Sequence, residues 1–473
     1  MTDQVAKNTL LLTIASIGQK IIAFVYFLFL ARIMMPDATG QYYLALSVTT
    51  IFSVVADFGL TPVVIREIAK DHTRAKSILA HAMGLKVPFM GLAACGAILA
   101  GKMLGYSISV QWLIAFATVV LMLDALHLLF YGVLRGYQNL RIESIGVFTG
   151  MMTTAIVGAF VLWFHPTLTF LVFALFCGSS MNVIIAGWKV VRQIGWAGLM
   201  PAYSTTTLWL LKTAIPFALA AVFIKVYSYV DTIFISKYLD TIAVGLYAVA
   251  YKFTYAFQFL PLAFTAALYP GMSALAQKDT VMLEKVLHKS LWYMAIISAP
   301  IVFGLYAVAP EAVALAGDSY GDAARVLKVL VFVLIPIFLD FPVGSLLNAS
   351  GYQSVKTTIM GVTMIINVAL NALLIPLLGI LGAAYAAIVS FTFLFGAGLF
   401  VLPRIIPSLS YVSILKKLLP IYLSAAIMLM MVLVLKPLIG WVLVIPLGGI
   451  VYLAGLVISG SIKRNDFLVM KRL

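Results

Sequence analysis

The run TLLLTIASIGQKIIAFVYFLFL, residues 9–30, decides the class of fold. It is long enough to cross a bilayer as an α-helix, because about 20 apolar residues span the hydrocarbon core. It is too long for the core of a signal peptide, and no small-residue cleavage site follows it, so we expect it to remain in the mature chain. Lys20 lies near its middle, where an ammonium group is costly and requires a compensating role.

The composition extends this conclusion to the whole chain. Of its 473 residues, 63% are hydrophobic and 10% are charged, and the mean hydropathy is +1.11. Soluble domains are about half apolar and about a quarter charged. The sequence therefore predicts an all-α polytopic membrane protein of about fourteen transmembrane helices. The expected spans are roughly 9–30, 40–60, 80–100, 109–131, 146–164, 168–188, 209–235, 244–270, 290–309, 324–348, 357–378, 380–403, 417–435 and 437–460.

The basic residues behind the net charge of +15 indicate how the chain is oriented in the membrane. Most of the 31 lysines and arginines fall in alternate loops, on the side that also holds both chain ends. The positive-inside rule therefore predicts a multi-pass protein of the cell (inner) membrane with both termini in the cytoplasm. With this explanation for the basic residues, we expect no nucleic-acid partner.

An internal repeat is visible along the chain, as in many transporters. Its matches occur in order with slowly rising offsets, as small loop insertions would produce. A shift of 205 places Lys20 on Lys225, Arg32 on Lys237 and Gly40 on Gly245, a shift of 208 places Lys70 and Asp71 on Lys278 and Asp279, and a shift of 215 places GYQNLR (136–141) on GYQSVK (351–356).

The repeat predicts the domain organisation. Residues 1–200 and 201–405 should form two six-helix bundles, and residues 406–473 two extra helices with a basic cytoplasmic tail. An even number of helices per repeat predicts a pseudo-twofold axis along the membrane normal. Lys20 and Lys225, on the first helices of the two halves, are expected to face one cavity from opposite walls.

Three stretches carry a resemblance to a known family. They are NTLLLTIASIGQKIIAFVYFLFLARIMMPDATGQYYLALS (8–47), DFGLTPVVIREIAKD (57–71) and LRGYQNLR (134–141). With the duplicated plan, they resemble the multidrug, oligosaccharidyl-lipid and polysaccharide exporter superfamily, in its polysaccharide-transport branch of Wzx-type flippases. The resemblance covers nearly the whole chain and implies a MATE-like fold.

The resemblance also implies a function. The expected substrate is a polyprenyl-pyrophosphate-linked oligosaccharide, moved from the inner to the outer leaflet by alternating access. The other expected partners are membrane lipid, H+ or Na+ as a coupling ion, and polysaccharide-assembly proteins. Fixed ammonium groups in a wet cavity would offset the desolvation of the pyrophosphate.

Basic residues inside the expected spans are candidates for that anion contact. Lys20 lies about 16 Å along its span, which is too far for its side chain to snorkel to the interface. The substrate-binding candidates are Lys20, Lys225, Lys252, Arg32, Lys237, Tyr251 and Tyr255. Solvated helix ends are the alternative for Arg32 and Lys237, and core packing is the alternative for the tyrosines. Lys86, Lys212, Arg325 and Lys328 lie close enough to interfaces to snorkel.

Four acids within the spans are candidates for ion coupling or gating. They are Asp231, Asp124, Asp340 and Asp57. A carboxylate buried in the membrane can carry a coupling proton or coordinate sodium, and a structural ion pair is the alternative. His127, three residues after Asp124, would instead form a core hydrogen bond.

Three other functions compete with the flippase interpretation. A cation-coupled drug exporter of the same superfamily would favour carboxylates over mid-span lysines. A flippase for a peptidoglycan precursor, lipid II, handles a similar pyrophosphate lipid. A polysaccharide polymerase or ligase would need an external catalytic loop, and the longest expected external loop, residues 310–323, is short. Finding no paired catalytic acids, metal cluster or nucleotide-binding loop, we expect no enzyme activity, cofactor, metal site or catalytic residue.

Overall fold

The computed structural model describes residues 2–276 and 278–462, and the expected basic tail at 463–473 lies outside them. The described chain is α-helical, with short 3₁₀ turns and no strand, and clusters into two compact units, Met1–Ala248 and Val249–Leu473. The first unit contains α1 (Thr2–Asp57), α2 (Leu60–Lys70), α3 (Ala75–Met103), α4 (Ile108–Gly136), α5 (Leu140–Phe164), α6 (Leu168–Ile194), α7 (Thr205–Tyr238) and the first half of α8 (Thr241–Tyr255).

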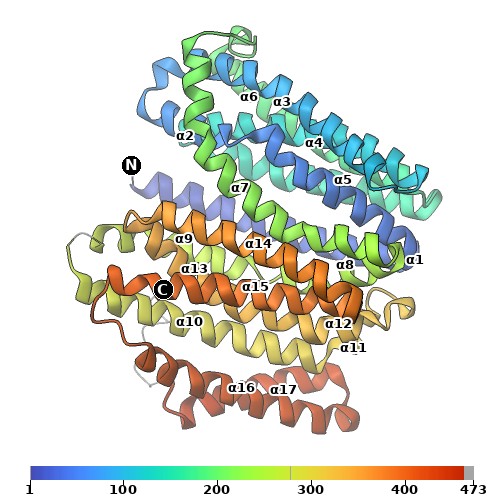
Figure 1. Ribbon diagram of the computed structural model, residues 1–473, viewed down its shortest axis with the longest axis vertical. Helices are drawn as coiled ribbons and strands as arrows, with labels where there is room; N and C mark the ends of the chain where they lie inside the picture. Colours follow the sequence, from blue (N-terminus) through green and yellow to red (C-terminus); the bar gives the residue numbers. More distant parts are fainter. Residues whose placement is uncertain (1, 277, 463–473) are drawn as a thin grey trace. The chain divides into compact units, whose positions relative to one another are not determined.

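The second unit contains the rest of α8 and the remaining helices (Figure 1). These are α9 (Phe259–Leu275), α10 (Thr280–Ala307), α11 (Ala309–Ala314), α12 (Ala323–Leu330), α13 (Leu334–Ala349), α14 (Gln353–Leu378), α15 (Ile380–Val401), α16 (Tyr411–Ile439) and α17 (Trp441–Ile458). Packing thus assigns α7 to the first unit, whereas the repeat assigns it to the second half. The domain boundary near residue 200 and the pseudo-twofold axis remain predictions.

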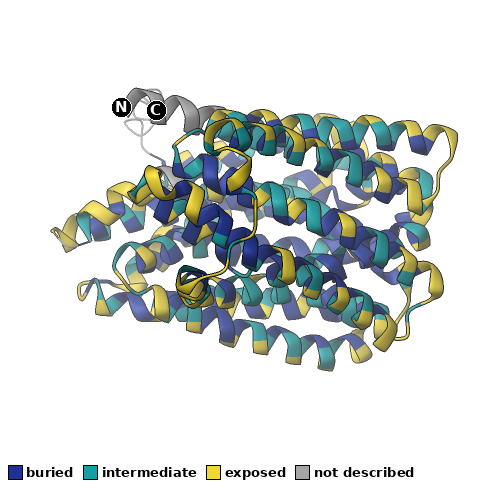
Figure 2. Ribbon diagram, turned by 90° about the horizontal axis from the view of Figure 1, so that it is seen from above, coloured by how far each residue is buried: buried dark blue, intermediate teal, exposed yellow. Residues whose placement is uncertain are grey.

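Within the described residues, twelve segments are helical, long and apolar enough to cross a membrane. This agrees with the expected fold class. The count is below fourteen because α1 contains two expected spans and because α8 and α9, with 15 and 17 residues, share one. Figure 2 shows exposed residues along the helices as well as in loops, as expected for lipid-facing surfaces.

The first two expected spans form one long helix with a sharp kink. Met35 interrupts α1 at φ 63° and ψ 168°, and Pro36 follows. A proline disfavours α conformation in the residue before it and removes a backbone hydrogen bond. Pro36 therefore explains why the kink lies at Met35. The half of α1 that carries Lys20 therefore runs in a different direction from the half that ends at Asp57.

The glycines matched by the repeat meet beside this kink. A Cβ on Gly40 would lie 1.7 Å from the carbonyl oxygen of Thr241, and one on Gly245 would lie 2.0 Å from that of Pro36. Thr241 also donates its hydroxyl hydrogen to the Asp37 carboxylate. The two glycines allow α1 and α8 to approach at backbone contact.

The expected eighth span is broken into two helices. The expectation of one continuous helix over 244–270 is wrong, because α8 ends at Tyr255 and α9 begins at Phe259. Pro261 in the first turn of α9 cannot donate a hydrogen bond and would clash with the carbonyl of residue 257 in a continuous helix. Short hydrogen-bonded turns span the break, including Phe257 N to Thr254 O at 3.3 Å.

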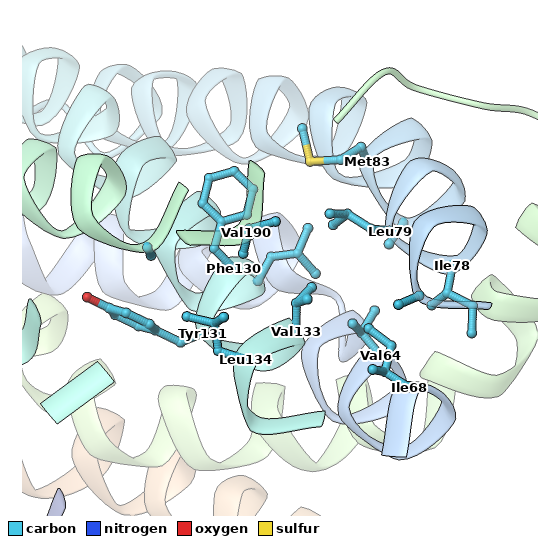
Figure 3. Close-up of a cluster of buried hydrophobic side chains, with 14 residues drawn as sticks. Val64, Ile68, Ile78, Leu79, Met83, Phe130, Tyr131, Val133, Leu134 and Val190 are labelled. Atoms are coloured by element: carbon cyan, nitrogen blue, oxygen red, sulfur yellow. The ribbon is translucent and has the colours of Figure 1, made fainter. Parts of the chain in front are cut away.

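Side chains from four helices fill the interior at one end of the first unit. Figure 3 shows Val64 and Ile68 of α2 facing Ile78 and Leu79 of α3, with α4 and α6 side chains completing the cluster. This packing fixes α4 and α6 against each other. Both helices carry polar residues of the candidate site.

Candidate functional site

Asp124 and Lys225 interact inside the first unit. Asp124 on α4 accepts a hydrogen bond of 2.5 Å from the Ser179 hydroxyl on α6, and it interacts electrostatically with Lys225 on α7. The Lys225 ammonium also lies 5.7 Å from the centroid of the Tyr229 ring. The Asp124 side chain is 53% exposed, so an ion or a ligand has access to its carboxylate.

Three further polar residues of the first unit lie near Asp124 or interact electrostatically with one another. His127 Nδ1 lies 3.6 Å from Asp124 Oδ1, and His127 interacts electrostatically with Lys86 on α3. The Lys86 ammonium donates a 2.7 Å hydrogen bond to Asp57 at the end of α1. We call Asp57, Lys86, His127, Asp124 and Lys225 the polar network; its two carboxylates balance its two ammonium groups.

This arrangement corrects the expectation for Lys86. Its side chain is 0% exposed and paired with Asp57, so it does not snorkel to an interface. Asp57 also accepts a 2.5 Å hydrogen bond from Thr61, and its side chain is 19% exposed. These contacts favour a structural ion pair for Asp57 over ion coupling.

Lys20 lies on α1 in the same unit as Lys225. A Cβ on Gly18 would contact the Phe148 ring of α5 at 3.2 Å, so Gly18 faces α5. Two residues rotate a helical position by about 200°, which directs Lys20 away from that interface. Its side chain is half-buried. That it shares a substrate cavity with Lys225 stays a prediction.

Asp231 is held by hydrogen bonds within the first unit. Its carboxylate accepts hydrogen bonds from the Tyr247 hydroxyl and from the Thr232 amide, the latter at 2.7 Å, and the residue is only 5% exposed. The Tyr247 contact links α7 to α8 beside the α1 kink. Asp231 is therefore well placed to fix these helices, and its coupling role stays a prediction.

Asp340 belongs to a separate ion pair in the second unit. Its two carboxylate oxygens lie 2.7 and 2.8 Å from the Lys356 ammonium, which α14 supplies. Both side chains are largely buried. Asp124 and Asp340 occupy corresponding helices of the repeat, but their partners differ.

Lys252 lies in the last turn of α8, next to the break before α9. The rings of Tyr251 and Tyr255, one turn apart, stack with centroids 5.7 Å apart, and Tyr255 is 40% exposed. Broken membrane helices line the binding sites of many transporters, because their free backbone groups and helix ends can face a ligand. Lys252 and the two tyrosines lie next to this break, and their role as substrate contacts stays a prediction.

The two remaining cations occupy helix ends. Lys237, in the last turn of α7, is exposed and donates to the carbonyl oxygen of Leu104 at 3.2 Å. Arg32 is exposed on α1, three residues before the kink. Their positions favour the alternative interpretation as solvated ends, and a role in substrate binding stays a prediction.

Several polar partners were not identified from the sequence. Ser179 and Lys356 lie 55 and 16 residues from the acids they contact. The buried Glu143 pairs with Arg135 across the turn between α4 and α5. The repeated stretches GYQNLR and GYQSVK lie at the turn between α4 and α5 and at the turn between α13 and α14. Lys356 is the last residue of the second stretch, so the repeat could have identified it as a candidate.

Residues 2–276 and 278–462 contain no group of three or more histidine, cysteine, aspartate or glutamate residues that could hold a metal ion. The polar network instead offers one exposed carboxylate, that of Asp124, in electrostatic interaction with the Lys225 ammonium. Chemically, this arrangement can exchange ions or bind an anion.

Family models match most of the chain. A model described as polysaccharide biosynthesis protein matches residues 5–276, and one described as MatE matches residues 216–373. The chain is 31% identical over 192 residues to the probable flippase AglR of Haloferax volcanii and 26% identical over 167 residues to its probable low-salt glycan biosynthesis flippase Agl15. These alignments span 40% and 35% of the respective relatives.

Solved structures of the same architecture cover most of the chain. An inward closed conformation of the lipid II flippase MurJ has a TM-score of 0.76 at 15% identity, covering 97% of this chain and 100% of that one. An inward-facing MATE family transporter of the MOP superfamily has a TM-score of 0.69 at 13% identity, covering 83% and 96%. These likenesses confirm the expected MATE-like fold.

Proposed function

Because the chain belongs to the polysaccharide biosynthesis protein family of the exporter superfamily, we propose that it is a flippase for a polyprenyl-pyrophosphate-linked oligosaccharide. It moves the lipid from the inner to the outer leaflet by alternating access and makes no chemical change to it. The similarity to two probable flippases supports this proposal. The observation that carries it is the electrostatic interaction between Lys225 and the exposed carboxylate of Asp124, both on membrane-spanning helices of the first unit.

Lys225 has the chemistry to hold the pyrophosphate. A sugar-pyrophosphate carries negative charge that is costly to desolvate, and charge-assisted hydrogen bonds from an ammonium group offset that cost. Asp124 is the competing anion in the substrate-free protein. Substrate binding would therefore replace one anionic partner of Lys225 with another. We propose Lys20 of the first unit and Lys252 of the second as further cationic substrate contacts.

The exchange of partners suggests how transport is coupled. Binding of H+ or Na+ at Asp124 would neutralise the carboxylate and release Lys225 to bind the pyrophosphate. Loss of the ion would restore the interaction and favour substrate release. Either ion is compatible with the exposure of Asp124 and with the hydroxyl of Ser179 beside it.

We propose the cell membrane as the location, with both termini in the cytoplasm. The distribution of lysine and arginine supports this orientation. Membrane lipid surrounds the helices, and the proteins that assemble the polysaccharide are the partners that supply and consume the substrate.

The test is flipping of a fluorescent polyprenyl-pyrophosphate oligosaccharide in proteoliposomes, with and without proton and sodium gradients. We expect the parent to flip it and Lys225→Ala and Lys20→Ala to slow flipping at least about tenfold, because each removes a charged hydrogen-bond donor. Lys212→Ala removes an exposed lysine from the same helix as Lys225 and should leave flipping unchanged.

Three results would change the proposal. Unimpaired flipping by Lys225→Ala, with the variant correctly inserted, would remove the anion site. A parent that flips only lipid II would favour the peptidoglycan-precursor alternative. A parent that moves organic cations and no polyprenyl lipid would favour the drug exporter.

A further inference from the structure

A basic cavity lies between three helices of the second unit. Its volume is about 760 Å³, and its walls come from the first turns of α10, the first turns of α16 and the end of α17. The side chains important for its chemistry are those of Lys285, His288, Lys289, Trp292, Lys416 and Lys417. All of them belong to the second unit, whereas Lys225 and Asp124 belong to the first.

The cavity carries excess positive charge. Four lysines line it together with one acid, Glu284, which accepts a 2.5 Å hydrogen bond from Ser408 and lies 3.5 Å from His288. Within the described part of the chain, none of the four lysines forms an ion pair with an acidic residue. An anion that enters the cavity therefore meets several ammonium groups at once.

We expect the cavity to lie at the depth of lipid headgroups. Its lysines are within the first three turns of α10 and the first two turns of α16, near the ends of membrane-spanning helices. Trp292 donates its indole hydrogen to the carbonyl oxygen of Ser461 at 3.1 Å, and tryptophan is typical of membrane interfaces. The orientation proposed above places this end of the unit on the cytoplasmic side.

Apolar surface adjoins the basic residues. Leu415 and Leu419 on α16 are 63% and 50% exposed, and Val457 and Ile458 at the end of α17 are 54% and 87% exposed. A free phosphate ion has no apolar part that could pack against this surface. A lipid would place its acyl chains there while its phosphate contacts the lysines.

We propose that this cavity binds the phosphate headgroup of an anionic membrane lipid from the cytoplasmic leaflet. Basic pockets between transmembrane helices on this side recognise such headgroups. The site goes beyond the flippase function, because the lipid bound here is a resident ligand and is not transported. It would link α16 and α17, which lie outside the repeat, to α10.

The test uses the full chain purified in neutral detergent, with lipid binding followed by native mass spectrometry. The probes are phosphatidylglycerol, phosphatidylcholine and inorganic phosphate. We expect phosphatidylglycerol to bind in preference to phosphatidylcholine and the double variant Lys416→Gln/Lys417→Gln to bind it about thirtyfold more weakly. The matched control Arg74→Gln/Lys76→Gln removes two exposed cations elsewhere on the predicted cytoplasmic side and should bind like the parent.

Other outcomes would overturn the proposal. Equal binding of phosphatidylglycerol by the parent and the Lys416/Lys417 variant would show that the cavity is not the site. Displacement of the lipid by millimolar inorganic phosphate would assign the cavity to a small anion. If the variant does not fold, Lys285→Gln/Lys289→Gln tests the opposite wall. Because binding is measured without transport, the result does not depend on the flippase proposal.

Discussion

Lys86 and Asp57 show how a membrane bundle accommodates a buried charge. The Lys86 side chain is fully buried, and its ammonium contacts the Asp57 carboxylate at 2.7 Å. Removing one partner leaves an uncompensated charge, whereas replacing both with apolar residues is often tolerated. Each residue of the pair therefore stabilises the fold mainly by neutralising the other, and the cost of removing one depends on whether the other is present.

This dependence gives a prediction at the scale of the residue. Asp57→Ala, which leaves Lys86 without its carboxylate, should destabilise the protein by about 3–5 kcal/mol. The double variant Asp57→Leu/Lys86→Met should recover much of that loss. Thermal unfolding in detergent measures both, and a single variant as stable as the parent would show that the pair is dispensable.

The sequence identified the charged residues of the polar network but not all of their contacts. Asp57, Asp124 and Lys225 are conspicuous because charges are rare in apolar spans. Their partners depend on helix rotation and on packing between distant segments. Lys86 was assigned to an interface because it lies only a few residues inside its expected span, and only the packing of α3 shows that its side chain turns inward.

At the scale of the element, the contact between α1 and α8 depends on two glycines. A side chain at Gly40 or Gly245 would overlap a backbone carbonyl, and backbone atoms cannot move aside as a flexible side chain can. The repeat predicted that these glycines correspond, but not that they lie at one shared contact. The contact lies next to the kink, where Met35 has a positive φ and Pro36 follows.

We predict that Gly245→Ala destabilises the protein by about 1–3 kcal/mol, the usual cost of overpacking. Gly91→Ala is the matched control, since nothing lies within 4 Å of a Cβ at that position of α3 and alanine is the better helix former. The measurement is the melting temperature of each purified variant, compared with that of the parent. A Gly245→Ala protein with the same melting temperature as the parent would refute the close contact.

The spans were predictable from hydropathy, but their interruptions were not. Proline is tolerated within transmembrane helices when neighbouring groups satisfy the freed carbonyls. The presence of Pro36 and Pro261 therefore did not distinguish a kink from a complete break. The outcome depends on the surrounding contacts, and it produced a kink within α1 and a break between α8 and α9.

At the scale of the whole molecule, the orientation in the membrane gives the clearest prediction. In a variant with Cys95 and Cys177 replaced by alanine, Asp318→Cys should react with a membrane-impermeant maleimide in intact cells. Arg74→Cys should react only after permeabilisation, because the distribution of basic residues places its loop in the cytoplasm. Both side chains are exposed, so access to the residue itself is not limiting. The reverse labelling pattern would invert the proposed direction of transport.

The order of synthesis has a consequence for the polar network. Asp57 and Lys86 are 29 residues apart, so their helices enter the bilayer one after the other and the pair forms early. Asp124 precedes Lys225 by about 100 residues, which a ribosome takes about 5–20 s to synthesise. Ser179 arrives in that interval, but the ammonium group comes last. Membrane insertion of α7 therefore completes the charge balance of the polar network, and a chain arrested before that helix would hold Asp124 in the bilayer without Lys225.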